Sequence, residues 1–447
     1  MKYNPHDYQK TAIQHILDNP NCGIFAQVGR GKSSMALTAL EELTSRLEVA
    51  KALIIAPKRV AAHTWRAEIQ KWDHTKHLVL SRIIGNPKER IAALRSHADV
   101  YTIGRDNVAW LVDYCQRILK RWPFDFVVID ESSNFRNRAA MRYKAVRKIL
   151  PHTDRLLLLT GTPFTKSLEG VWCQVFLLDK GKRLGPTLTS FRDEYMTIKH
   201  NGFGYSDKEG STERVSEKIK DICISIKNSD FDDVPERVDI TEEIELDNMA
   251  GYLEFKKTET LYIQEKDLEI TPMNAGALYN KLLQYSNGAV YTDDKGNYHV
   301  VDNTKLEVLV EEIEALEGAP VFIAYMFKSD FERMQKVIPG IVKLETDEQI
   351  DAFNRGEIPV LASHPASNAY GLNLQESCYN MIWFGLPWDL ELYIQFLGRI
   401  DRQGQKNKVV NKRLIGKGTI EELVLSRLAD KDFNQDKLLE LLKNYMK

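Results

Sequence analysis

Short apolar runs alternate with helix-like segments along most of this chain. In the first half, four near-continuous apolar runs have the length of strands, at 52–56, 100–103, 126–129 and 156–159. The second half has four more, at 321–325, 360–362, 381–384 and 409–415. Apolar strands flanked by helices are typical of parallel sheets that are buried on both faces. The pattern therefore predicts an α/β protein with two parallel-sheet lobes.

The stretch from about 165 to 303 has a different pattern. Glycines interrupt it, and a polar loop occupies 201–211. Apolar residues then recur at spacings that indicate helices, at Ile244, Leu246, Tyr252, Phe255, Leu278, Leu282 and Leu283. A single irregular loop of this length would be improbable inside a compact domain. We therefore expect helical insertions at the junction between the two lobes.

These patterns divide the chain into four expected parts. The first lobe covers 1–164, and a helical protrusion of that lobe covers 165–240. A helical insertion at 241–302 leads into the second lobe, which covers 303–447. Within the second lobe, the stretch 420–445 indicates a charged amphipathic helix or helix pair.

Composition narrows the class of protein. Of the 447 residues, 43% are hydrophobic and 28% are charged, as in ordinary globular proteins, and no stretch approaches the ~20 apolar residues of a membrane span. The first residues lack the apolar core of a signal peptide, and the five cysteines are widely spaced without a CxxC pair, so we expect a reduced, cytoplasmic protein without a zinc site. The net charge is −2, so a nucleic-acid footprint must be local. The basic runs 136–148 and 406–417 are candidates, although each fits a solvated surface equally well.

Residues 26–33 read Ala-Gln-Val-Gly-Arg-Gly-Lys-Ser, between a short apolar run and a helix-like segment. This order of strand, glycine-rich loop and helix is typical of a phosphate-binding loop, although Ala26 replaces the first glycine of the full pattern. Gly29 and Gly31 let backbone N–H groups turn toward phosphate oxygens, Lys32 reaches the terminal phosphates, and the Ser33 hydroxyl binds Mg²⁺.

A second chemical signal follows the apolar run 126–129. Asp130 and Glu131 come directly after this predicted strand. A carboxylate at the end of a buried strand can hold a metal ion, and its neighbour can polarise the attacking water. We therefore expect Asp130 to bind Mg²⁺ and Glu131 to be the catalytic base. Together with the phosphate loop, the pair indicates a nucleoside triphosphatase.

Further motifs appear in a fixed order along the chain. They are Tyr8-Gln9, Trp65 with Glu68 and Trp72, Leu-Thr-Gly-Thr-Pro at 159–163, Gly-Leu-Asn-Leu-Gln at 371–375, Gln-Phe-Leu-Gly-Arg-Ile-Asp-Arg at 395–402 and Gln-Gly-Gln at 403–405. In order and spacing the chain resembles superfamily 2 helicases of the DEAD/DEAH-box-like kind, and more closely the Swi/Snf-type double-stranded DNA translocases. Asp-Glu-Ser-Ser at 130–133 is similar to the compact bacteriophage and prophage members. The resemblance implies two RecA-like lobes.

The resemblance also implies roles for individual residues. Gln9 would bind the adenine edge, which favours ATP. The nucleotide-binding residues would be Gln9, Gly29, Arg30, Gly31, Lys32, Ser33, Ser34 and Asp130. Arg399 and Arg402, expected on one face of a helix, would act as arginine fingers, and Gln395 would contact the γ-phosphate or its water.

Two more groups of residues complete the roles that the resemblance implies. Thr160 and Thr162 would couple the nucleotide site to movement. The contacts to a nucleic-acid backbone would come from Lys58, Arg59, Thr102, Arg105, Ser367, Asn368 and Gly371. Contacts of this kind give affinity without reading the sequence.

We therefore expect a monomeric, DNA-stimulated ATPase that uses ATP and Mg²⁺ to translocate on double-stranded DNA. Its task would be to remodel protein–DNA or branched DNA complexes, in the host cytoplasm if a phage encodes it. The central stretch 165–303 is a candidate surface for a protein partner. Two alternatives stay open: a strand-separating DNA or RNA helicase, and a nucleic-acid clamp that does not hydrolyse ATP.

Overall fold

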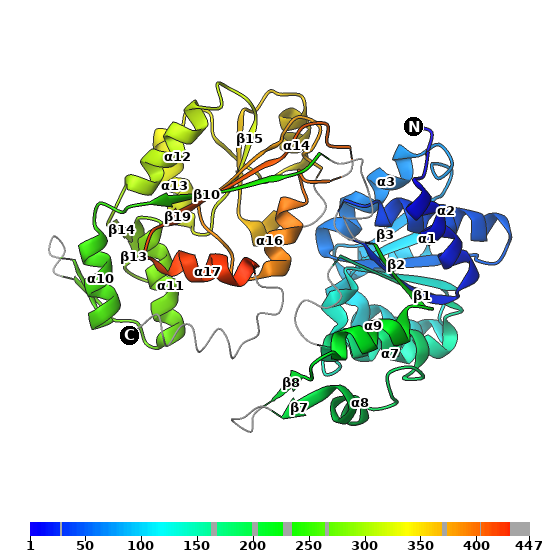
Figure 1. Ribbon diagram of the computed structural model, residues 1–447. Helices are drawn as coiled ribbons and strands as arrows, with labels where there is room; N and C mark the ends of the chain where they lie inside the picture. Colours follow the sequence, from blue (N-terminus) through cyan, green and yellow to red (C-terminus); the bar gives the residue numbers. More distant parts are fainter. Residues whose placement is uncertain are drawn as a thin grey trace. The chain divides into compact units, whose positions relative to one another are not determined.

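The structure is a computed structural model that describes residues 1–26, 29–161, 168–198, 204–226, 235–263, 268–368, 373–402 and 404–429. The chain divides into two compact units, Met1–Phe231 and Asp232–Lys447 (Figure 1). Each unit contains one large sheet in which all recorded strand pairs are parallel. The expected α/β class with two parallel-sheet lobes is confirmed.

The first unit is built on a seven-stranded sheet of order β3-β4-β2-β5-β6-β1-β9. Its strands are β1 (Asn21–Ala26), β2 (Ala52–Ala56), β3 (Leu80–Ile83), β4 (Val100–Gly104), β5 (Phe126–Asp130), β6 (Arg155–Thr160) and β9 (Cys223–Ile226). Every residue of β2, β4, β5 and β6 is buried. The four apolar runs of the first half are therefore confirmed as strands.

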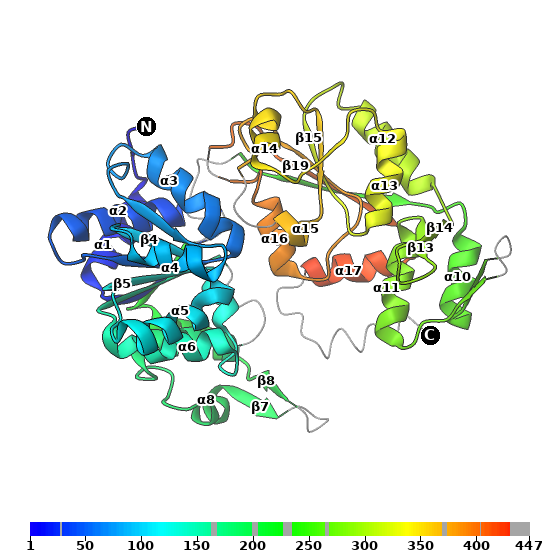
Figure 2. The same ribbon diagram turned by 180° about the vertical axis from the view of Figure 1, so that it is seen from behind.

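Helices cover both faces of this sheet (Figures 1 and 2). One face carries α1 (Asp7–Asp18), α2 (Lys32–Ser45) and α3 (Trp65–Lys71). The other carries α5 (Val108–Tyr114), α6 (Met141–Ile149), α7 (Leu168–Asp179) and α9 (Ser211–Ile219). The helix α4 (Pro87–Arg95) follows the edge strand β3.

The stretch 165–240, expected as a helical protrusion, contains strands as well as helices. After α8 (Leu188–Tyr195), the strands β7 (Met196–Ile198) and β8 (Tyr205–Asp207) form an antiparallel hairpin. The strand β9 then joins the large sheet beside β1. These strands have only three or four residues, which is too short to give a clear alternation in the sequence.

The second unit is built on a six-stranded sheet of order β10-β19-β18-β15-β17-β16. Its strands are β10 (Val238–Ile244), β15 (Val321–Ala324), β16 (Val342–Lys343), β17 (Val360–Ser363), β18 (Asn380–Trp383) and β19 (Val410–Gly416). The four apolar runs of the second half are confirmed as strands. Around them lie the helices α12 (Thr304–Glu314), α13 (Lys328–Val337), α14 (Asp347–Asn354), α15 (Pro365–Asn368), α16 (Leu390–Leu397) and α17 (Ile420–Ala429).

The helical interpretation of Ile244 and Leu246 is wrong. Ile244 ends β10, an edge strand whose other residues are exposed or half-buried, and both side chains pack into the core of the second sheet with Leu306 and Leu309. A strand with one buried position and several carboxylates does not show the apolar run that marks a central strand.

Between β10 and α12, the chain forms a small accessory module. It contains α10 (Met249–Thr258), α11 (Ala275–Ser286) and the short hairpins β11 (Leu261–Ile263) with β12 (Leu268–Ile270) and β13 (Ala289–Tyr291) with β14 (Tyr298–Val300). The stretch 241–302, expected as a helical insertion, thus contains two helices and two short hairpins, and its residues 241–244 belong to β10. Of the C-terminal stretch 420–445, the described part is the helix α17.

A buried ion pair ties α12 to α17. The Lys305 ammonium donates to both carboxylate oxygens of Glu421 at 2.6 and 2.7 Å, and to the Asn287 amide oxygen at 2.9 Å. Both charged side chains are 1% exposed. Burial lowers the pKa of Lys305, and the neighbouring Glu421 charge opposes that shift. The pair, with Asn287 at the end of α11, therefore fixes α11, α12 and α17 to one another.

The five cysteines are all buried as free thiols. Burial raises the pKa of Cys22, Cys115 and Cys378 to about 12 in each case. Among the described residues, no helix combines the length and the apolar character that crossing a lipid bilayer requires.

Replacing Lys305 by methionine should destabilise the protein by about 3–5 kcal/mol, because Glu421 would keep a buried charge without its partner. The free energy of unfolding, measured by urea denaturation, checks this. The double variant Lys305→Met/Glu421→Leu should recover much of the loss. Lys417→Met, which removes an exposed pair with Glu245, is the control and should unfold like the wild type. A Lys305→Met protein as stable as this control would contradict the structural role of the pair.

Candidate active site

The phosphate loop leaves the carboxyl end of β1 and runs into the N-terminus of α2. Gly29 and Gly31 have φ values of 83° and 74°, a left-handed conformation that glycine adopts without the cost of a Cβ atom. A Cβ atom at Gly31 would collide with the Gln9 amide. The helix α2 begins at Lys32, directly after the loop. The backbone N–H groups of its first turn and its positive dipole end suit a phosphate.

Lys32 lies across this loop. Its side chain is buried, and its ammonium donates to the Ala26 carbonyl at 2.7 Å. Ser33 is half-buried and Ser34 is buried, with the Ser34 hydroxyl donating to the Gly31 carbonyl at 2.8 Å. A buried ammonium beside a helix N-terminus is an arrangement that fits a triphosphate.

Gln9 supports the same loop from α1. Its side chain is 2% exposed, and its amide nitrogen donates to the carbonyl of Arg30 at 3.4 Å. The Gln9 amide oxygen accepts from the backbone N–H of His6 at 3.0 Å. The Tyr8 hydroxyl also donates to the Arg30 carbonyl, at 3.4 Å. The structure thus places Gln9 against the phosphate loop; its expected contact with adenine stays a prediction.

The carboxylate pair lies at the end of β5, as the sequence predicts. Asp130 and Glu131 are 9% and 8% exposed. One Asp130 oxygen, Oδ1, accepts from the backbone N–H of Glu131 at 3.0 Å, and the other, Oδ2, accepts from the indole N–H of Trp65 at 3.1 Å. Among the described residues, no group of three or more His, Cys, Asp or Glu side chains could hold a metal ion. One carboxylate and a serine fit Mg²⁺, which keeps several waters and substrate phosphates as ligands.

Glu131 has a left-handed backbone, with φ 53° and ψ 55°. This conformation costs a residue with a side chain about 1–2 kcal/mol. It turns the chain sharply from β5 into the short helix η4 (Ser132–Phe135), where Asn134 donates from its backbone and its side chain to the Glu131 carbonyl at 3.0 and 3.1 Å. Such strain is common at functional sites and is held here by these bonds.

The candidate nucleic-acid contacts of the first unit lie beside each other after β2 and β4. These strands pair with Ala56 opposite Gly104, and a Cβ atom on Gly104 would lie 3.7 Å from the Cα atom of Lys58. Lys58 is exposed, whereas Arg59 and Arg105 are half-buried. The predicted basic contacts are therefore brought together at one edge of the sheet.

The other described candidates of this unit, Thr102 and Thr160, are buried inside the fold. Thr102 is fully buried, and its hydroxyl donates to the Ala61 carbonyl at 2.7 Å, so its side chain supports the turn after Lys58 and Arg59. Thr160 ends β6, opposite Phe25 of β1, and is also fully buried. Thr162 lies outside the described residues.

The arginines of the second unit do not lie within a helix, so that prediction is wrong. The helix α16 contains Gln395 but ends at Leu397, and Gly398 caps it. Arg399 and Arg402 follow in tight turns, in which Arg399 N–H donates to Phe396 and Arg402 N–H donates to Ile400. These two bonds span three and two residues, whereas the Asp401 N–H keeps the helical spacing of four by donating to the Leu397 carbonyl at 3.0 Å.

These side chains have defined contacts within the second unit. Gln395 donates to the buried carboxylate of Glu391 at 3.3 Å, and Arg399 Nε donates to the Gln395 carbonyl at 2.8 Å. The Arg402 guanidinium donates to the Asn373 amide oxygen. Ser367 is exposed at the end of α15, whereas the Asn368 side chain and Gly371 lie outside the described residues.

The sequence motifs do not predict two side-chain contacts, Trp65 with Asp130 and Arg402 with Asn373. The sequence identified Trp65 and Asn373 as family-like residues, but not that Trp65 binds Asp130 or that Asn373 binds Arg402. The pairs are separated by 65 and 29 residues. Such pairings depend on the tertiary fold.

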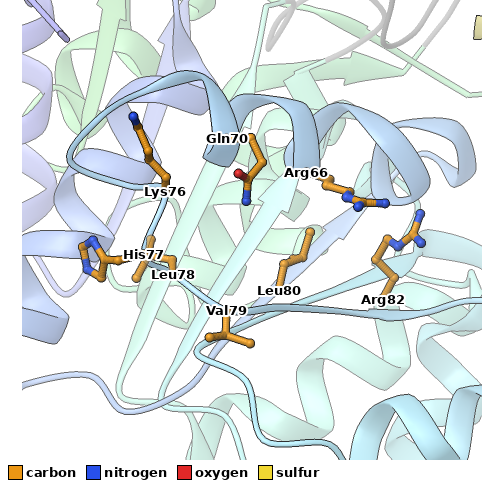
Figure 3. A pocket seen from close by; sticks show the side chains of 8 residues that line it. All are labelled: Arg66, Gln70, Lys76, His77, Leu78, Val79, Leu80 and Arg82. Atoms are coloured by element: carbon orange, nitrogen blue, oxygen red, sulfur yellow. The ribbon is translucent and has the colours of Figure 1, made fainter. Parts of the chain in front are cut away.

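A shallow hollow of about 500 Å³ lies elsewhere on the first unit, between α3 and β3. Figure 3 shows Arg66 and Arg82 at one end and Lys76 and His77 at the other. Its lining contains no carboxylate and none of the predicted site residues. The hollow is therefore separate from the phosphate loop.

The model of the SNF2-related domain matches residues 8–282. Putative protein p41 of Acyrthosiphon pisum secondary endosymbiont phage 1 is 34% identical to the chain and is covered over 99% of both sequences. An uncharacterized ATP-dependent helicase of Bacillus subtilis, YqhH, is 24% identical over 96% of this chain and 78% of its own length. A probable chromatin-remodeling complex ATPase chain of Oryza sativa is 23% identical over 96% of this chain and 40% of its own.

A solved structure shares the fold. Dbp5 of Saccharomyces cerevisiae, bound to RNA and ADP BeF3, aligns with a TM-score of 0.55 at 15% identity, covering 99% of this chain and 94% of its own. The SWI2/SNF2 ATPase core of Sulfolobus solfataricus in complex with dsDNA aligns with a TM-score of 0.48 at 19% identity, covering 99% and 95%.

Replacing Lys32 by alanine should lower the rate of ATP hydrolysis by at least about 10²-fold, because a buried positive charge at the phosphates is lost. Phosphate release at saturating ATP measures this rate. The control is Ser45→Ala, which changes the exposed end of the same helix and should hydrolyse ATP like the wild type. Equal rates for the two variants would exclude this loop as the ATP site.

Proposed function

Because this chain belongs to the SNF2-related family, as the family model that matches residues 8–282 establishes, we propose that this ATPase motor translocates on double-stranded DNA. Its work would be to remodel protein–DNA complexes or branched DNA. The observation that carries the proposal is that one edge of the first sheet holds both the phosphate loop with Asp130 and Glu131 and the basic turn at Lys58 and Arg59.

Relatives whose names refer to chromatin support DNA as the track. A probable chromatin-remodeling complex ATPase chain of rice and a SWI/SNF-related regulator of chromatin of mouse match this chain over 96% and 94% of its length, each at 23% identity. The proposed contacts are basic and polar groups at strand ends, which suit a phosphate backbone rather than base edges. We therefore propose binding without sequence specificity, by a monomer. The accessory module at 249–300 is the surface that we propose for any protein partner.

In the proposed site, Lys32 and the N-terminus of α2 bind the phosphates of ATP. Ser33 and Asp130 hold Mg²⁺, and Glu131 acts as the base for the attacking water. Bound Mg²⁺ would neutralise charge on the phosphates. Arg399, Arg402 and Gln395 are proposed to act on the γ-phosphate, so hydrolysis would depend on residues of both units.

A strand-separating helicase is the second candidate. It is favoured by the name of one relative, the uncharacterized ATP-dependent helicase YqhH. The two candidates differ in the polymer that stimulates hydrolysis.

The decisive measurement is steady-state ATP hydrolysis without nucleic acid and with single-stranded DNA, duplex DNA or duplex RNA. Duplex DNA should give the largest stimulation. Arg402→Ala should lose about 10³-fold or more of the stimulated rate, because an arginine finger stabilises transition-state charge. Arg355→Ala, on an exposed pair with Glu357, is the control. Stronger stimulation by single strands or RNA would favour the helicase, and none by any polymer would argue against a nucleic-acid motor.

Lys58→Ala should weaken duplex binding equally for unrelated DNA sequences, because the residue is proposed to contact a phosphate. The slope of log affinity against log salt should fall by about one. Fluorescence anisotropy across a salt series measures both. Lys336→Ala, exposed on α13, should behave like the wild type. A loss that depends on the DNA sequence would contradict a backbone contact.

A further inference from the structure

Trp65 connects the segment that follows β2 with the carboxylate at the end of β5. It is fully buried at the start of α3, and its indole N–H donates to Asp130 Oδ2 at 3.1 Å. An indole has one donor and no acceptor. Since Oδ1 already accepts from the Glu131 backbone, two donors from different elements set the rotation of this carboxylate.

The segment before Trp65 has an unusual backbone. Residues Val60–Thr64 form a π-helical turn, and the Trp65 N–H closes it by donating to the Val60 carbonyl. Turns of this type are rare in proteins, and many of those that are known lie at functional sites. An α-helix rotates by about 100° per residue, so the wider turn changes the direction in which Trp65 points. The π turn therefore determines whether the indole can reach Asp130.

Two side chains from neighbouring strands hold this turn. Thr102 donates to the Ala61 carbonyl at 2.7 Å, and Arg82 donates to the Ala62 carbonyl at 2.8 Å. Lys58 and Arg59 come directly before the turn and carry the proposed contact with the DNA backbone. The segment 58–65 thus has the proposed DNA contact at one end and the donor to the metal-binding carboxylate at the other.

We propose that Trp65 is a positioning residue that holds Asp130 in the orientation that binds Mg²⁺. We also propose that this orientation depends on the π turn at Val60–Thr64. The second part rests on the proposed function, because it requires DNA to contact Lys58 and Arg59. A phosphate bound there would fix the turn, and the continuous helix would carry the change to the indole. DNA binding would then improve the metal site and raise the rate of hydrolysis.

The test is Trp65→Phe, which keeps an aromatic ring and removes the N–H donor. Loss of a hydrogen-bond partner behind a metal ligand typically costs 10–100-fold in metal affinity or activity. We expect the affinity for Mn²⁺ in the presence of a non-hydrolysable ATP analogue, measured by electron paramagnetic resonance, to fall by about 10–100-fold. The stimulation by duplex DNA should fall as well, while the dissociation constant for DNA stays unchanged.

Trp72→Phe is the matched control. Trp72 follows the same helix, and its indole donates to Glu68 at 2.8 Å, away from Asp130. This variant should keep the wild-type Mn²⁺ affinity and stimulation. The midpoint of thermal unfolding of each variant shows whether a loss of Mn²⁺ affinity comes from unfolding or from a misplaced Asp130 carboxylate.

Wild-type Mn²⁺ affinity in Trp65→Phe would overturn the positioning role. Weakened Mn²⁺ binding with undiminished stimulation by DNA would overturn the link to the turn. If the wild type itself is not stimulated by duplex DNA, the proposed function fails, but the Mn²⁺ measurement still tests the role of Trp65. If Trp65→Phe does not fold, Thr102→Val takes its place, since it removes one support of the turn. Its Mn²⁺ affinity should also fall, and wild-type affinity would overturn the proposal.

Discussion

The parallel direction of the strands in the first sheet is the constraint on which the candidate site depends. Parallel strands have their carboxyl ends along one edge of the sheet, and the loops that follow them therefore meet there. The phosphate loop follows β1, the carboxylate pair ends β5 and the basic turn follows β2. Reversing a strand of five residues would move its loop by about 17 Å. No side-chain substitution could recover the site after such a change.

The sheet direction brings the loops together, and the backbone conformation of single residues then sets how the loops turn. Gly29, Gly31 and Glu131 all have positive φ values, and they flank the region where phosphates and a metal are proposed to bind. The glycines adopt this conformation without steric cost. At Glu131 the same conformation is strained, and the hydrogen bonds from Asn134 help to maintain it. The residues that we propose as catalytic are therefore arranged by the fold before any ligand binds, which is the condition for electrostatic catalysis.

The central strands and the phosphate loop could be predicted because each is specified by local sequence. Runs such as 52–56 and 126–129 are apolar throughout, and the loop needs glycines and a lysine at fixed spacing. The edge strands β3, β9 and β10 were not predicted. The first two are short, and β10 carries acidic side chains at exposed positions. The end of α16 before Arg399 was missed as well. The contacts of Trp65 with Asp130 and of Arg402 with Asn373 join distant segments, which no periodicity reveals.

The buried cysteines have a consequence for how this motor can be observed. A thiol reacts as its thiolate. Burial raises the pKa of all five natural cysteines, including Cys173 and Cys223, and so keeps them protonated at neutral pH. A new cysteine on an exposed helix would ionise far more readily and would also be open to solvent. Fluorescent dyes could therefore be attached at chosen positions in each unit without first removing the natural cysteines.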